Sequence, residues 1–115
     1  MKVLFYVFNN PKYLDSVLSG LVKLNIKGGT VFDCSGMGRE MARVHDHDEF
    51  TSMFGGLRSL FGPDYKNTKA LMLILTEDHI PEVIGVIENV VGNLESPETG
   101  ILFTFNLDMT KGIKL

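Results

Sequence analysis

The stretch K-V-L-F-Y-V-F, Lys2 to Phe8, is the first of the dense apolar segments that decide the fold. Its β-branched and aromatic residues favour a strand whose apolar side chains fall on both faces. Residues 70–75 (A-L-M-L-I-L) and 101–105 (I-L-F-T-F) have the same character, and residues 30–34 (T-V-F-D-C) predict a shorter strand. The sequence therefore predicts four strands.

Helical periodicity predicts a helix after the first strand and another after the third. Apolar residues from Leu14 to Leu24 recur at helical spacing, and Pro11 suits the first turn. A second apolar stripe runs from Ile80 to Leu94, and Asp78 is a candidate cap for that helix. The resulting βαββαβ order predicts an α+β, ferredoxin-like antiparallel sheet with both helices on one face.

Composition narrows the class of protein. The chain has 115 residues, 44% hydrophobic, with a net charge of −3. We expect a single domain, 1–115, with no basic face for nucleic acid. A single cysteine suits a reducing cytoplasm, and no apolar run is long enough to cross a bilayer. We therefore expect a cytoplasmic protein.

Strands that are apolar on both faces create a packing problem. Two helices can cover only one face of such a sheet, and a sheet face in water should be polar. We interpret the second face as buried against other subunits. The alternative is that the long excursion over residues 37–69 folds back over its own sheet.

Three short segments resemble one family. Residues 10–17 (N-P-K-Y-L-D-S-V), 24–31 (L-N-I-K-G-G-T-V) and 36–40 (G-M-G-R-E) are similar to K-P-F-K-L-D-E-V, G-I-K-G-M-T-V and G-F-G-R-Q of the P-II signal-transduction family. The likeness extends over residues 1–40 and 70–105.

The resemblance implies a homotrimer whose sheets face a central axis, and a regulator rather than an enzyme. Members bind a small-molecule effector between subunits, often an adenine nucleotide. They regulate a membrane transporter or a metabolic enzyme, for example in nitrogen regulation. Their T-loop, here about residues 38–68, contacts that target. In agreement, the sequence contains no catalytic triad, paired catalytic carboxylates or Walker loop.

The resemblance places a ligand site at a few positions. Glycines at the root of the loop would let the backbone approach a phosphate or ribose, and an arginine would add charge-assisted bonds. Thr30 could bond an adenine edge. The alternatives are that the glycines permit a tight strand exit with positive φ and that the threonine is only a strand former. The candidate ligand residues are Thr30, Gly36, Met37, Gly38, Arg39, Glu40 and Gly100.

The segment before the last strand departs from the family. Residues 94–101 read L-E-S-P-E-T-G-I, so Ile101 stands where the family has a phosphate-binding lysine. Glu95 and Glu98 add negative charge there, which disfavours phosphate. The cofactor thus stays open: an adenine nucleotide is one option, with the usual ATP site degraded at Ile101.

Two features of the excursion carry further hypotheses. In an extended segment His45 and His47 point the same way and could share a Zn, Ni or Cu ion, which makes a trimeric metal-binding protein the alternative function. A solvated polar stretch is the simpler interpretation. Apolar residues at helical spacing follow, which suit either partner docking or packing on the same trimer. The candidate docking residues are Phe50, Met53, Phe54 and Leu57.

Overall fold

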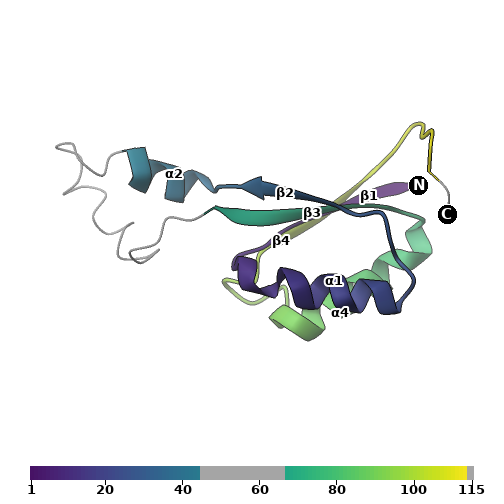
Figure 1. The fold of residues 1–115 in the computed structure, drawn as a ribbon, viewed down its shortest axis with the longest axis horizontal. Helices are drawn as coiled ribbons and strands as arrows, with labels where there is room; N and C mark the ends of the chain where they lie inside the picture. The colour runs from purple at the N-terminus through teal and green to yellow at the C-terminus, as the bar shows by residue number, and fades with distance from the viewer. Residues whose placement is uncertain (45–66, 114–115) are drawn as a thin grey trace. The chain divides into compact units, whose positions relative to one another are not determined.

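The computed structural model describes residues 1–44 and 67–113 (Figure 1). The chain separates into two compact units, residues 1–32 with 69–115, and residues 33–68. In chain order the elements are β1 (Lys2–Val7), η1 (Pro11–Tyr13), α1 (Leu14–Lys23), β2 (Thr30–Cys34), α2 (Met37–Val44), β3 (Thr68–Leu75), η2 (Glu77–His79), α4 (Ile80–Val91) and β4 (Ile101–Asn106).

The four strands form one sheet in the order β2-β3-β1-β4. β1 is antiparallel to both of its neighbours, so that Phe5 lies opposite Met72 on β3 and opposite Phe103 on β4. All four predicted strands are present, with ends that differ from the predicted ones by at most two residues. The prediction of an α+β protein with an antiparallel sheet is confirmed.

One face of the sheet packs against α1 and α4 (Figure 1). Alternation along β1 turns Leu4, Tyr6 and Phe8 toward the helices, and all three are at most 1% exposed. The two helices approach closely at Gly20, where an added Cβ would lie 2.6 Å from Val86 Cγ1. The core is completed by α1, β3 and α4, through Val17, Leu21, Leu71, Leu73, Leu75, Val83 and Ile87.

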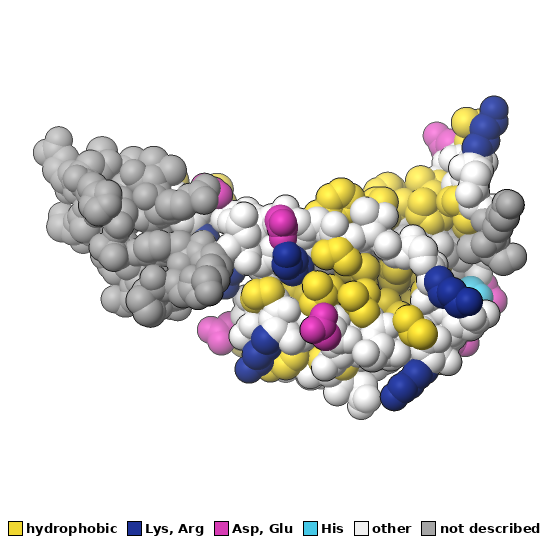
Figure 2. Space-filling view, viewed as in Figure 1, with side chains coloured by type: hydrophobic (Ala, Val, Ile, Leu, Met, Phe, Trp, Pro, Cys, Tyr) yellow, Lys and Arg dark blue, Asp and Glu magenta, His cyan; other side chains and the backbone are white. Residues whose placement is uncertain are grey.

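The other face of the sheet has a row of phenylalanine rings. Phe5 stacks on Phe103 at a centroid distance of 5.3 Å and on Phe32 at 6.0 Å, and Phe103 stacks on Phe105 at 6.5 Å. The rings of Phe32, Phe103 and Phe105 are 40%, 44% and 48% exposed. Hydrophobic side chains also gather along the sheet, away from the helices, in Figure 2. The prediction that the strands are apolar on both faces is confirmed.

The start of α4 corrects one prediction. Asp78 does not cap this helix, because it lies inside the short helix η2 and His79 occupies the position before α4. Asp78 is hydrogen-bonded locally, to the Thr76 hydroxyl, and this bond lowers the pKa of the Asp78 carboxyl below its ordinary value. Pro81 lies in the first turn of α4, where proline is tolerated.

The unit of residues 33–68 contains a helix that the sequence analysis did not predict. α2 begins directly after Gly36, whose carbonyl oxygen accepts a hydrogen bond from Glu40 N at 3.0 Å. Gly36 is not among the described glycines with positive φ, so the interpretation of a tight strand exit with positive φ is wrong for it. Within residues 1–44 and 67–113, no helix has the length and apolar character needed to cross a membrane.

Candidate functional site

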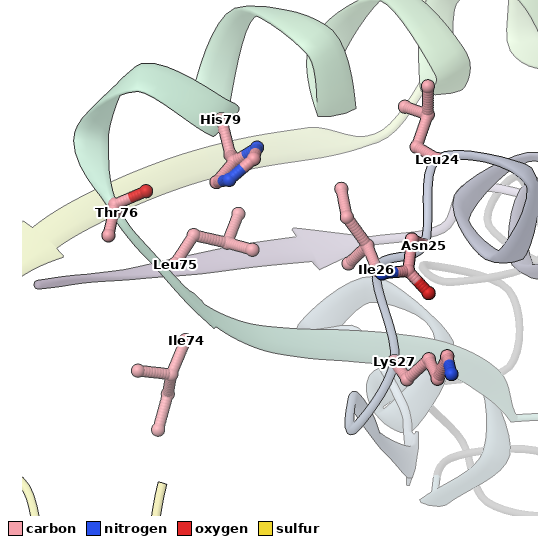
Figure 3. A pocket seen from close by; sticks show the side chains of 8 residues that line it. All are labelled: Leu24, Asn25, Ile26, Lys27, Ile74, Leu75, Thr76 and His79. Carbon is pink, nitrogen blue, oxygen red and sulfur yellow. The ribbon is translucent and has the colours of Figure 1, made fainter. Parts of the chain in front are cut away.

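A cavity of about 360 Å³ lies where the α1–β2 connection meets the end of β3 and the start of α4 (Figure 3). Its size falls within the range of ligand pockets, roughly 300–1,000 Å³. All of its walls belong to the larger unit. The lining residues are Leu24, Asn25, Ile26, Lys27, Ile74, Leu75, Thr76 and His79.

The connection after α1 is held in one conformation by its own backbone. Asn25 N donates to Val22 O at 2.9 Å, and Ile26 N donates to Leu21 O at 3.0 Å. These bonds satisfy carbonyl groups at the end of α1, and Asn25 takes the left-handed conformation, φ 61°, that often ends a helix. The wall of the cavity is therefore formed before any ligand arrives.

The chain must then pass close to β3. A Cβ at Gly29 would lie 2.7 Å from Leu73 Cδ2 and 3.2 Å from Leu71 Cδ1. A larger residue at position 29 would require the side chains of Leu71 and Leu73 on β3 to shift. The sequence Gly28-Gly29 thus has a packing role beside the cavity.

The lining of the cavity combines apolar side chains with the polar residues Asn25, Lys27, Thr76 and His79. Figure 3 shows Ile26, Leu75 and His79 facing one another across the gap, whereas Ile74 points to the other side of β3. His79 Nδ1 lies 3.4 Å from Glu82 Oε2. If Nδ1 donates to that carboxylate, Nε2 of a neutral His79 is an acceptor for a ligand. The cavity therefore suits a small molecule with a flat or apolar body and a polar edge.

The candidate ligand residues are not gathered at one place in a single chain. Thr30 is exposed at the start of β2, and Gly100 directly precedes β4. β2 and β4 are the two outer strands of the sheet, about 14 Å apart at the usual spacing of adjacent strands. One small ligand cannot touch both edges of the same sheet.

The remaining candidates lie in the unit of residues 33–68. Gly38, Arg39 and Glu40 are half-buried in the first turn of α2, and Met37 is 84% exposed. Because their backbone is helical, their side chains point in different directions around α2. The segment is therefore not an open glycine turn. Arg39 is the charged group among them that could bind an anionic ligand.

The structure explains why position 100 is a glycine, which the sequence did not reveal. It has φ +98°, and an added Cβ would press on the Val7 carbonyl oxygen and lie 2.7 Å from Tyr6 Oη. The Tyr6 hydroxyl donates to the carbonyl of Thr99, next to this glycine. Tyr6 is fully buried, and burial raises the pKa of its phenol to about 12.

The residues lining the cavity were missed by sequence reasoning. Segment 24–31 was singled out only for its likeness to a family, and His79 was not singled out at all. No local pattern could join them, because the cavity depends on β3 lying beside β2 in the sheet. The glycine pair before β2 was the one signal of close backbone packing.

The candidates in the middle of the chain cannot be placed. His45 and His47, proposed as metal ligands, lie outside the described residues, as do the docking candidates Phe50, Met53, Phe54 and Leu57. Within the described ranges, no group of three His, Cys, Asp or Glu side chains is placed to hold a metal ion. Comparison with models of protein families and with curated protein sequences gives no match.

Proposed function

We propose that this protein is a cytoplasmic, trimeric, P-II-like regulator that binds a small effector between subunits. The observation that carries the proposal is the phenylalanine row on the open face of the sheet. The proposal includes the ferredoxin-like βαββαβ arrangement, with the excursion between β2 and β3, about residues 38–68, acting as a T-loop. It is a regulatory role rather than an enzymatic one.

The exposed phenylalanine rings on the open face of the sheet support assembly into a trimer. Phe32, Phe103 and Phe105 are each nearly half exposed although they point from a sheet. Fully burying a phenylalanine side chain stabilises by about 1.5–3 kcal/mol, so covering the remaining half of each ring contributes about 1 kcal/mol per ring. Three copies that pack these faces together would remove all of these rings from water.

The distribution of the candidate residues supports a site that is shared by two copies. Thr30 and Gly100 lie at opposite edges of one sheet. In a ring of subunits the β2 edge of one copy can approach the β4 edge of the next, which brings such residues to one ligand. The cavity beside Ile26 and His79 would then accept the flat part of the effector, and an adenine base fits that description.

The T-loop, about residues 38–68, would transmit the binding of the effector to a target protein. Residues 36–40 lie at the root of the excursion, so an effector held near Arg39 would favour one arrangement of the loop over others. Such an effector shifts the population of loop states only by its difference in affinity for them. The target is a membrane transporter or a metabolic enzyme, as in nitrogen regulation, and it would recognise one of these states.

Titration calorimetry tests the effector directly. ATP, ADP, AMP and cyclic nucleotides are titrated into the protein, with Zn²⁺, Ni²⁺ and Cu²⁺ in a parallel series. The proposal expects saturable nucleotide binding that weakens in Arg39→Ala and in Ile26→Asp. Metal binding lost in His47→Ala, with no nucleotide binding, would instead support a metal-binding protein.

A further inference from the structure

We propose that the loop from Gly92 to Gly100 excludes polyphosphates, so that the effector carries at most one phosphate group. This inference rests on the proposed function, because it concerns the effector of the same inter-subunit site. It assigns a specificity role to Glu95, Glu98 and Ile101.

Three backbone donors in the first half of the loop are already used within the chain. Leu94 N donates to Glu88 Oε2 at 2.8 Å, and Glu95 N donates to Asn93 Oδ1 at 2.9 Å. Ser96 N donates to Asn93 O at 2.9 Å. A loop that cradles a polyphosphate does so with several backbone N–H groups that point at the anion. These three groups have partners before any ligand arrives.

The far end of the loop is fixed in the same way. The Thr99 hydroxyl lies 2.8 Å from Ser96 O and 3.3 Å from Leu94 O, as a donor to the loop's own carbonyl groups. The Tyr6 hydroxyl holds the Thr99 carbonyl from the buried side. Opening this end of the loop would break the hydrogen bond that the buried Tyr6 hydroxyl donates to the Thr99 carbonyl. These bonds hold the loop in one conformation, in which the N–H groups of Leu94, Glu95 and Ser96 are not available to a ligand.

The charge of the loop opposes anions. Glu95 and Glu98 are both exposed on it. An open cavity of about 560 Å³ beside Gly100 has Glu88, Glu95 and Ile101 among its lining residues. The described residues that line it include two glutamates and no lysine or arginine, and like charges at close range raise the free energy of a bound polyphosphate.

The favoured effector therefore has an aromatic or apolar body with little negative charge. A nucleoside monophosphate or a cyclic mononucleotide meets this description, whereas ADP and ATP carry extra charge toward the carboxylates. Removing each carboxylate should improve the binding of ATP relative to AMP by about fivefold at low salt, and less at high salt.

The first experiment measures the ratio of the ATP and AMP dissociation constants by calorimetry. The wild type is compared with Glu95→Gln/Glu98→Gln and with that pair combined with Ile101→Lys. All three substitutions are at exposed positions. The matched control for the pair is Asp15→Asn/Glu77→Gln, which changes the net charge as much as Glu95→Gln/Glu98→Gln does, at exposed sites on other elements. We expect AMP to bind at least as tightly as ATP, and the ratio to shift toward ATP in the loop variants only.

The second experiment does not depend on a nucleotide. Inorganic tripolyphosphate at millimolar concentration is added to ¹⁵N-labelled protein, and the amide resonances of residues 93–100 are followed. The inference expects them to stay in place in the wild type and to move in the variant with Ile101→Lys.

The outcomes separate the two proposals. Movement of the wild-type loop resonances, or ATP binding more than tenfold tighter than AMP, overturns the exclusion of polyphosphates and leaves the regulator in place. Absence of binding by every nucleotide overturns the nucleotide effector, and the tripolyphosphate titration still decides the inference about the loop.

Discussion

Replacing Gly100 by alanine tests how the last strand is joined to β1. A Cβ-bearing residue at φ +98° costs about 1–3 kcal/mol in backbone conformation. The Cβ would also press on the Val7 carbonyl oxygen and lie within 2.7 Å of Tyr6 Oη and 2.9 Å of Tyr6 Cε1. Relief requires β4 to move or the buried ring to shift, which adds about 1–3 kcal/mol. We expect Gly100→Ala to lower the free energy of unfolding by about 4 kcal/mol.

Two glycines provide matched controls for this variant. Gly92 has φ +97°, but a Cβ there would meet no atom within 4 Å, so Gly92→Ala should show only the conformational cost, about 1–3 kcal/mol. At Gly36 a Cβ also meets nothing within 4 Å, and its φ is not positive, so Gly36→Ala should change stability by less than about 0.5 kcal/mol.

The assay is urea unfolding followed by far-UV circular dichroism, since the chain has no tryptophan. The protomer concentration is held fixed because assembly contributes to apparent stability. If Gly100→Ala is no less stable than Gly92→Ala, the contact with Tyr6 and Val7 does not constrain this glycine. The structural explanation of Gly100 would then be wrong.

Three further predictions concern the larger unit. Burial raises the pKa of Tyr6 from 10.0 to about 12, so the contribution of its neutral phenol to the free energy of unfolding is complete below pH 10, and up to about 3 kcal/mol is lost as the pH rises through 12. Tyr6→Phe should remove this part of the pH dependence in unfolding measured from pH 9 to 12. Gly20→Ala should lower the free energy of unfolding by about 1 kcal/mol, because the added Cβ meets Val86. In a Val86→Ala background this contact is gone, and the same substitution should raise the free energy of unfolding by up to about 1 kcal/mol through the higher helix propensity of alanine. Additive effects of the two substitutions in urea unfolding would contradict this coupling. Thr76→Val should raise the pKa of the Asp78 carboxyl toward its ordinary value in an NMR titration, and an unchanged value would mean that the hydroxyl does not hold it.

The strands and main helices were predictable because their patterns are local. Lys2–Val7 and Thr68–Leu75 are apolar on both faces, and this property both identified them as strands and predicted the open phenylalanine face. The first helix was equally clear from its apolar stripe and proline. Patterns of this kind depend on neighbours in the sequence.

The features that were wrongly predicted or missed depend on contacts between distant residues or on competing local hydrogen bonds. α2 was missed because the glycines around Met37 were interpreted as a turn, although the following residues include good helix formers. Asp78 was given a capping role that its bond to Thr76 replaces. For Gly100, the sequence could not show that β1 passes against its α-carbon, because the two segments are more than ninety residues apart.

The mass of the protein in solution tests the central claim most directly. A trimer has three times the chain mass of 12.8 kDa, about 38 kDa, and sedimentation equilibrium should give this value unchanged on dilution. Phe103→Asp places a charge in the phenylalanine row, directly opposite Phe5, and should reduce the mass to that of one chain while the circular dichroism spectrum is retained. A wild-type protein that sediments as a stable monomer of 12.8 kDa would contradict the account.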